Sequence, residues 1–268
     1  MLAWLLPLWY NNPMRLDKFL ADCDIATRSE LKKIIKAGRV KVNDEIAKDP
    51  AMKINEDSDS VTLDGASVTY EKMRYFMFNK PAGCVSATRD KLSETVIAYL
   101  KEENIKGLFP VGRLDKDTEG LLLITNDGPL CHDLLSPKKH VDKTYIVIAD
   151  KALSDKDIEL MEKGIDIGDD KPCLPASLGK IAYDSQPMTY ILDAHKDDLS
   201  EEGEEVFSGS YPAYSITIHE GRFHQIKRMF EACGSRVLYL KRISMGKLKL
   251  DDNLAPGEYK KINLEDII

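Results

Sequence analysis

The 268-residue sequence contains only five cysteines, and no two of them form a Cys-x-x-Cys pair. They are odd in number and widely spaced, at Cys23, Cys84, Cys131, Cys173 and Cys233. A disulfide framework or a cysteine-based zinc site requires regularly paired cysteines, so this pattern argues against both. The sequence fits a reducing compartment best, and we expect a cytoplasmic protein.

The sequence also lacks a long apolar run of the kind that crosses a bilayer. The apolar segment 1–13 is too short for that purpose. It also lacks the basic start and the small-residue cleavage site of a secretory signal. We interpret it as an extension or a mis-assigned start, with Met14 as the initiator; a peripheral apolar anchor is the less favoured alternative. No membrane partner is expected.

An excess of positive charge is missing as well, since the net charge is -7. The charges are unevenly distributed. Residues 28–41 hold six basic side chains against only Glu30, and residues 222–249 hold eight against only Glu231, whereas residues 193–205 are strongly acidic. One basic run is often no more than a solvated face. Two such runs indicate selective docking to a nucleic acid rather than indiscriminate binding.

Hydrophobic residues make up 43% of the chain and charged residues 31%, as in ordinary globular proteins. The first part, residues 14–72, has the pattern of a compact module. Residues 27–30 form a capping box that opens a helix with apolar residues on one face and lysines on the other. Short strands are predicted at 40–42 and 61–63, and residues 68–74 are the predicted linker.

Beyond the linker, short apolar runs are interspersed with a few helical patterns. We predict strands at 75–78, 107–111, 121–125, 144–149, 189–192, 214–219 and 237–240, and helices near 94–101, 129–135, 155–163 and 223–232. Residues 193–209 are predicted to be a long flexible insertion. Because strands and helices do not alternate regularly, the pattern favours an α+β fold with a largely antiparallel mixed sheet.

One loop carries the strongest chemical signal. Residues 112–120 read Gly-Arg-Leu-Asp-Lys-Asp-Thr-Glu-Gly and lead directly into an apolar run at 121–124. Glycines at both ends can adopt dihedral angles that other residues cannot, so the loop can hold Asp115 still before a buried strand. Taken alone, an aspartate in such a loop is also a common turn former.

Three further segments extend this signal along the chain. They are Lys143-Thr144-Tyr145, residues 220–229 (Glu-Gly-Arg-Phe-His-Gln-Ile-Lys-Arg-Met), and an N-terminal segment with Arg-Leu-Asp-Lys-Phe-Leu at 15–20 and Ala-Thr-Arg-Ser-Glu at 26–30. Together with the Asp115 loop, in this order and spacing, they resemble the small-subunit rRNA branch of the pseudouridine synthases, the RsuA type. The resemblance implies a small S4-like α/β RNA-binding domain at 14–72 and a catalytic domain at 75–268.

The resemblance also implies roles for three side chains. Asp115 matches the catalytic aspartate, an ionised carboxylate near the ribose and the base. Whether it attacks the base, attacks the ribose C1′ or removes a ribose proton stays open. Tyr145 matches the tyrosine that stacks on the flipped base. Lys227 matches the cation that pairs with Asp115 and keeps it ionised, with Arg222 as the second choice.

Other side chains near these motifs are expected to have simpler roles. Asp117 and Glu119 suit solvated or turn-capping positions, because three acids in one loop poorly match the paired carboxylates of a glycoside hydrolase. His224 is expected to be a hydrogen-bonding helix residue rather than a base. Its spacing from His219 is unsuitable for two metal ligands on a helix. We therefore expect no metal and, for an isomerisation without redox change, no cofactor.

The remaining candidates are assigned by their place in the motifs and in the basic runs. The expected substrate-binding residues are Arg113, Leu114, Lys143, Arg222, Gln225, Arg228 and Leu254. The expected RNA-docking residues are Arg15, Arg28, Lys32, Lys33, Lys36 and Arg39.

The sequence thus predicts an enzyme that isomerises a specific uridine of 16S rRNA, with rRNA or a small-subunit assembly intermediate as its partner and a monomeric state. Two alternatives remain open. One is a 23S rRNA pseudouridine synthase of the related branch, since the target is chosen by shape and docking rather than by a readable code. The other is a non-catalytic RNA-binding ribosome-assembly factor, against which the joint presence of Asp115, Tyr145 and Lys227 argues.

Overall fold

The computed structural model describes residues 13–182 and 211–268, apart from residues 24, 57, 71, 72, 102 and 104. The predicted strand at 189–192, the predicted insertion at 193–209 and nearly all of segment 1–13 lie outside the described residues. The chain divides into two compact units, Met1–Lys72 and Met73–Ile268.

In the first unit, two helices contact each other beside short strands. The helices are α1 (Leu16–Asp22) and α2 (Arg28–Lys36). A four-stranded antiparallel sheet has the order β3 (Glu45–Ile46), β2 (Val40–Val42), β5 (Val61–Leu63) and β6 (Ala66–Ser67), and β1 (Met14–Arg15) pairs with β4 (Lys53–Ile54).

Helix α2 begins at the predicted capping box. The Thr27 hydroxyl accepts a hydrogen bond from the Glu30 backbone, and the Glu30 carboxylate accepts one from the Thr27 backbone. Leu31 and Ile35 are fully buried, while the lysines of this helix are exposed. The predicted division of the helix into an apolar and a basic face is therefore confirmed.

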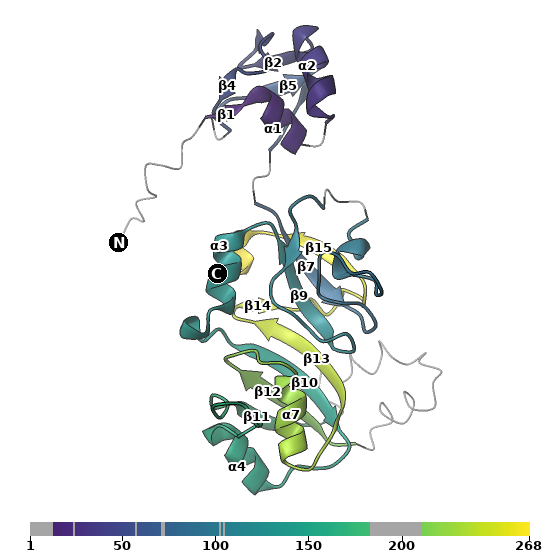
Figure 1. Cartoon of the computed structure of the whole chain (residues 1–268), viewed down its shortest axis with the longest axis vertical. Coiled ribbons are helices and arrows are strands. Elements are labelled where there is room, and N and C mark those ends of the chain that lie inside the picture. The colour runs from purple at the N-terminus through teal and green to yellow at the C-terminus, as the bar shows by residue number, and fades with distance from the viewer. Residues whose placement is uncertain are drawn as a thin grey trace. The chain divides into compact units, whose positions relative to one another are not determined.

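The second unit is built around a mixed sheet. In the part of it that the structure describes, nine strands form this sheet in the order β11-β12-β10-β13-β9-β7-β15, with β8 beside β9 and β14 beside β13 (Figure 1). The strands are β7 (Tyr75–Lys80), β8 (Phe109–Pro110), β9 (Glu119–Thr125), β10 (Lys143–Ala149), β11 (Ser177–Ile181), β12 (Ala213–Ile218), β13 (Val237–Met245), β14 (Leu248–Lys249) and β15 (Tyr259–Ile262). Only β9 and β13 pair in parallel, so the predicted fold class is confirmed.

Helices cover this sheet and bury its core. They are α3 (Gly128–Leu135), α4 (Asp155–Lys163) and α7 (Gln225–Ala232), with 3₁₀ turns η2 (Val96–Tyr99), η3 (Pro137–Lys139) and η4 (Leu264–Asp266). Helix α4 contacts β11 and α7 contacts β13 (Figure 1). The ring of Phe230 on α7 meets the ring of Tyr214 on β12 edge to face, and both are fully buried. Among the described helices, none has the length and apolar character that a membrane span requires.

Several predicted elements differ from the structure. The helix expected at 94–101 is only the 3₁₀ turn η2, because Thr95 is drawn into a bridge with Val85. The strand expected at 107–111 shrinks to β8, since Gly107 has a positive φ of 77°. Strand β13 continues five residues beyond its predicted end. The sequence pattern does not reveal this continuation, because the charged residues Lys241 and Arg242 interrupt the apolar run. Both side chains are nevertheless buried.

The parallel pairing of β9 with β13 depends on Gly120. A Cβ atom at this position would lie 2.2 Å from the Arg242 carbonyl oxygen, and the φ of Gly120 is +97°. Both facts exclude a larger residue here. Gly120 thus lets the end of the Asp115 loop run directly alongside Arg242.

Candidate active site

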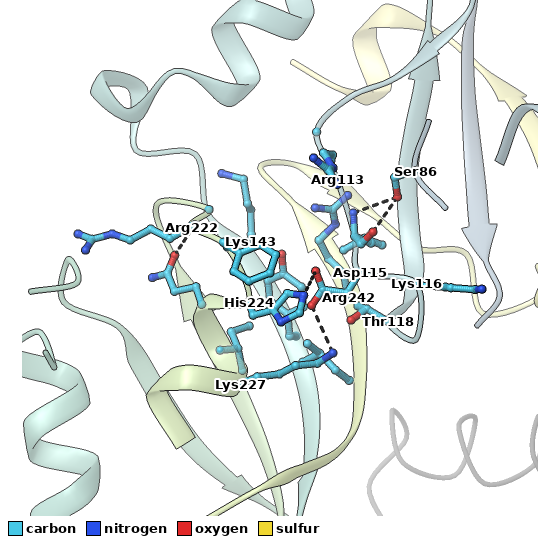
Figure 2. Close-up of a pocket in the computed structure, with 18 of the residues that line it drawn as sticks. Ser86, Arg113, Asp115, Lys116, Thr118, Lys143, Arg222, His224, Lys227 and Arg242 are labelled. Atoms are coloured by element: carbon cyan, nitrogen blue, oxygen red, sulfur yellow. Dashed lines mark hydrogen bonds and ion pairs between the residues drawn. The ribbon is translucent and has the colours of Figure 1, made fainter. Parts of the chain in front are cut away.

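A cavity of about 870 Å³ opens in the second unit (Figure 2). Its walls are formed by the loop before β9, residues 85–90, strands β10 and β13, and the residues at the start of α7. Eight of the predicted site residues line it. They include Asp115, Tyr145, Lys227, Lys143 and Arg222. Arg113, Leu114 and Gln225 line it as well.

Asp115 lies in the loop between β8 and β9, and the loop is fixed just before it. Gly112 takes a positive φ of 76°, as its place in the motif predicts. The Ser86 hydroxyl donates to the Leu114 carbonyl and accepts from the Leu114 backbone N–H, both at 3.0 Å. Leu114 itself is buried. A side chain on a backbone held in this way has little freedom to move.

A buried lysine fixes the other side of the loop. The Lys80 ammonium, which has no exposed surface, donates to the carbonyl of Lys116 at 3.2 Å and to that of Thr118 at 2.8 Å. Burial lowers the pKa of Lys80, and nearby negative groups oppose this shift. Hydrogen bonds to the loop carbonyls satisfy the ammonium, which a buried charge requires. Asp115 is therefore held between two anchored segments.

The Asp115 carboxylate faces two cationic or potentially cationic groups. Lys227 Nζ lies 3.3 Å from one carboxylate oxygen, and His224 Nε2 lies 3.6 Å from the other (Figure 2). The Asp115 side chain is 28% exposed, so a molecule bound in the cavity can contact it. The structure thus brings Asp115 and Lys227 together, as expected.

Lys227 also binds a second carboxylate. Its ammonium donates to both oxygens of Asp117, at 2.6 and 2.8 Å. Partial desolvation raises the pKa of Asp117, but the hydrogen bond and charge of Lys227 outweigh it and lower this pKa overall. The Asp117 side chain is 72% exposed, as expected for a solvated position, but it also shares the cation of the site, which the sequence did not predict.

Glu119 departs from the expected solvated role. It is only 5% exposed, and its carboxylate accepts a hydrogen bond from the Tyr239 hydroxyl at 2.9 Å. Glu119 stands at the start of β9, opposite Lys241 on β13. The side chain belongs to the interior of the sheet rather than to the surface of the loop, because the strand begins one residue before Gly120.

The residues before α7 form the rim of the cavity. His224 precedes the helix, with a positive φ of 48°, so it is not the helix residue that was expected. Its ring stacks on Phe223, with centroids 3.9 Å apart and planes 15° apart. Phe223 is 75% exposed. An exposed aromatic ring at a cavity rim is available to a ligand, and sequence reasoning did not single it out.

The wall formed by β10 and β13 carries buried polar groups. Tyr145 on β10 is 7% exposed and lies opposite Arg242 on β13. Lys143, two residues before Tyr145, is also 7% exposed. Arg242 is 2% exposed, and its Nε donates to the Leu121 carbonyl at 2.7 Å. Sequence reasoning missed Arg242 because it stopped the strand before this residue.

The second basic run is not a single basic face, contrary to expectation. Lys241 and Arg242 are buried in the sheet. Arg222 and Arg228 both pair with Asp169, at 3.4 and 2.6 Å. Arg222 therefore does not replace Lys227 beside Asp115, and Figure 2 shows its side chain directed away from that carboxylate.

Two of the expected substrate-binding residues do not line the cavity. Arg228 is engaged by Asp169, and the buried Leu254 packs in a different apolar cluster, where its carbonyl accepts from Asn79. In the first unit, Arg15 pairs with Asp17 and Arg39 pairs with Asp64. The other expected docking residues, Arg28, Lys32, Lys33 and Lys36, are exposed. Within the described ranges, no group of three or more metal-ligating side chains is found.

Comparison with protein families assigns both units. Residues 74–232 match the family model of RNA pseudouridylate synthases, and residues 14–60 match that of the S4 domain. The matched catalytic segment includes the Asp115 loop, Tyr145 and Lys227.

Several named relatives align with nearly the whole chain. A protein of Bacillus subtilis named as an RNA pseudouridine synthase is 42% identical over 255 residues, which cover 95% of this chain and 97% of that protein. The ribosomal small subunit pseudouridine synthase A of Vibrio cholerae is 39% identical over 256 residues, covering 95% and 98%. A crystal structure of a pseudouridylate synthase matches with a TM-score of 0.59 and 34% identity, covering 95% and 98%.

Proposed function

The chain belongs to the RNA pseudouridylate synthase family, and from this premise we propose that it converts a uridine of small-subunit ribosomal RNA to pseudouridine with Asp115 as the catalytic carboxylate. The relatives named as small subunit pseudouridine synthase A support the choice of rRNA. The S4 match supports an RNA partner for the first unit. The observation that carries the proposal is the anchored Asp115 carboxylate, which faces the cavity beside Lys227.

The reaction fits a site built around one carboxylate. The bond between C1′ and N1 breaks, a bond between C1′ and C5 forms, and the hydrogen lost from C5 is balanced by one gained at N1. Atoms and electrons balance within the nucleotide, so the reaction consumes no co-reactant. An ionised carboxylate beside the glycosidic bond can act as nucleophile or as proton acceptor. Lys227 Nζ and His224 Nε2 lie 3.3 and 3.6 Å from its two oxygens and can hold the carboxylate in place.

The recessed position of Asp115 supports base flipping. A uracil stacked in folded RNA cannot reach a carboxylate inside a cavity, so the nucleotide must leave its stack first. We assign Tyr145, on the cavity wall, as the surface against which the flipped base packs. The exposed ring of Phe223 at the rim is placed to stack on a neighbouring base of the RNA.

Replacing Asp115 by Asn tests the proposal. This change keeps the shape and removes the ionised oxygen, so we expect no pseudouridine formation and nearly unchanged RNA binding. Pseudouridines should be mapped in both ribosomal RNAs from a deletion strain complemented with wild type or with the Asp115→Asn variant. The matched control is Asp133→Asn, an exposed carboxylate on α3 that does not line the cavity.

The outcomes separate the alternatives. Turnover within about tenfold of wild type, a barrier change of only ~1.4 kcal/mol, would remove Asp115 from the catalytic role. A missing pseudouridine in large-subunit rRNA would reassign the substrate. If the deletion changed neither RNA, the chain would act as a binding factor without turnover.

A further inference from the structure

Two buried cations line the cavity without a carboxylate partner. Lys143 on β10 is 7% exposed and Arg242 on β13 is 2% exposed. Across the described ranges 13–182 and 211–268, neither forms an ion pair, whereas Lys227 in the same cavity binds two carboxylates. A buried cation is stable only if it is paired or fully hydrogen-bonded. The unpaired state of these two cations therefore points to an anionic ligand.

Their hydrogen-bonding capacity is also incompletely used. Arg242 donates from Nε to the Leu121 carbonyl, but its buried Nη2 has no hydrogen-bond partner among the described residues. The Lys143 ammonium has three donors, and the described contact is with the Val141 carbonyl at 2.9 Å. The buried hydroxyl of Thr118, which also lines the cavity, likewise lacks a partner within the described part of the chain. Buried polar groups normally form hydrogen bonds, so these unused donors favour a bound ligand as their partner.

The two cations lie near the same part of the cavity wall. Tyr145 lies opposite Arg242 across the β10–β13 pairing, and Lys143 is two residues from Tyr145 on the same strand. Burial and the positive charge of Arg242 both lower the pKa of Lys143, while Asp142 opposes them. Asp142 is itself bound by His219 at 2.8 Å. The wall therefore combines the ring of Tyr145 with the basic side chains of Lys143 and Arg242.

We propose that Lys143 and Arg242 bind the phosphodiester group next to the flipped uridine. This inference rests on the proposed function and names the part of the RNA that this wall recognises. A phosphodiester supplies one negative charge and two free oxygens to the unpaired donors. A uracil is neutral and would leave both charges uncompensated. Asp115 does not serve as the missing anion, because its oxygens already face Lys227 and His224.

Phosphate-ethylation interference on the wild-type protein tests this site and locates the target uridine in the same experiment. Small-subunit rRNA is ethylated at random on its phosphates, incubated with the enzyme, and sorted into converted and unconverted molecules. The position of the pseudouridine and the positions of interfering ethyl groups are then mapped in the same RNA. We expect ethylation of a phosphate directly flanking the converted uridine to be depleted at least tenfold from the converted pool.

Variants connect that phosphate to these residues. Lys143→Met and Arg242→Lys are compared with Lys138→Met, an exposed lysine outside the cavity. In the first two, we expect KM to rise about tenfold and the flanking-phosphate interference to weaken, while interference at distant phosphates persists. The Lys138→Met protein should retain the wild-type pattern. The wild-type map can still overturn the site if a variant fails to fold.

Each outcome has a distinct consequence. Conversion by wild type with no interference at either flanking phosphate would overturn the site alone. Undiminished flanking interference in a folded Lys143→Met protein would also overturn it. If wild type forms no pseudouridine, the proposed function fails, and the site fails with it.

Discussion

At the scale of single residues, one lysine serves two carboxylates. Lys227 donates to both oxygens of Asp117 and stands 3.3 Å from Asp115. Asp117 is 72% exposed, so water can replace much of its contribution. We expect Asp117→Asn to lower kcat by less than about tenfold, or ~1.4 kcal/mol. Lys227→Met should lower kcat on the order of a hundredfold, about 2.7 kcal/mol, since it removes the cation beside Asp115, the proposed catalytic carboxylate.

Single-turnover rates at saturating RNA measure both effects without a contribution from binding. Equal losses in the two variants would mean that Asp117, and not only Asp115, takes part in the reaction.

The ring of Phe223 gives a second prediction at this scale. It is 75% exposed and stacked on His224, so folding alone does not account for its position. Stacking on an RNA base contributes roughly 1–3 kcal/mol. We expect Phe223→Ala to raise KM for rRNA by about five- to a hundredfold with little change in kcat, and Phe223→Tyr to restore it. Steady-state kinetics on the three proteins measure the effect.

Leu92, which is 97% exposed, supplies the control. Its replacement by Ala removes apolar surface that is not stacked on a site residue, so KM should stay at the wild-type value. A similar rise of KM in both variants would show that general surface hydrophobicity, rather than stacking, assists binding.

At the scale of elements, the position of the Asp115 loop depends on the strand beside it. Lys80 closes β7 and holds the loop through the carbonyls of Lys116 and Thr118. Methionine at position 80 would keep the bulk and remove the donors. We expect Lys80→Met to lower kcat at least tenfold and to leave RNA affinity unchanged, because only the position of Asp115 is affected. The variant should also be less stable, because each lost hydrogen bond to a charged group lowers the free energy of unfolding by roughly 1.5–3 kcal/mol.

Hydrogen exchange of the peptide containing residues 112–118 should be faster in this variant, and kcat should fall in parallel. Lys91→Met, at an exposed lysine, is the control. Normal exchange together with a normal kcat would show that Ser86 and the glycines hold the loop without Lys80.

Local patterns are sufficient to predict several of these elements. The capping box at Thr27 fixes the start of α2, and the apolar run after Gly120 gives β9, because both signals lie within a few residues. The Asp115 loop is recognisable for the same reason. Its neighbours on the cavity wall are identified only from family motifs, since residues distant in the sequence meet through the sheet.

Tertiary burial explains what the sequence does not reveal. Arg242 lies in β13, which pairs with β10 on one side and β9 on the other. Because Arg242 is charged, the local sequence pattern indicates a loop rather than a buried strand. The local pattern indicates a surface acid at Glu119, but the Tyr239 hydroxyl allows this carboxylate to be buried. Edge strand β15 carries two lysines in four residues and shows no apolar pattern. Each case depends on a partner that no local pattern indicates.

At the scale of the whole molecule, the distribution of free cations differs between the two units. In the second unit, Lys143 and Arg242 are buried in the cavity wall and Arg222 and Lys227 are bound to carboxylates, whereas Arg113 and Lys116 are exposed at the cavity. In the first unit, Arg15 and Arg39 are paired, whereas the three lysines of α2 are exposed and form no ion pair with a described residue. Unpaired exposed lysines are free to contact phosphates. We therefore propose that the first unit docks the RNA and that the second carries the reaction.

The final prediction separates these two roles. Replacing Lys32, Lys33 and Lys36 by Ala removes three exposed positive charges far in sequence from Asp115. We expect weaker binding to small-subunit rRNA and a salt dependence of log K reduced by about two to three units of slope. The rate at saturating RNA should change little, because no group in the cavity is altered. Filter binding at several salt concentrations and single-turnover rates measure the two quantities.

A matched control replaces Lys151, Lys156 and Lys247 of the second unit, which are also exposed, by Ala. It changes the net charge by the same amount, so it separates specific docking from the general attraction of a charged surface. Equal losses of affinity in both triple variants would assign the effect to net charge. A lost saturated rate with unaltered affinity in the α2 variant would mean that the first unit acts in closing the active site and not in docking.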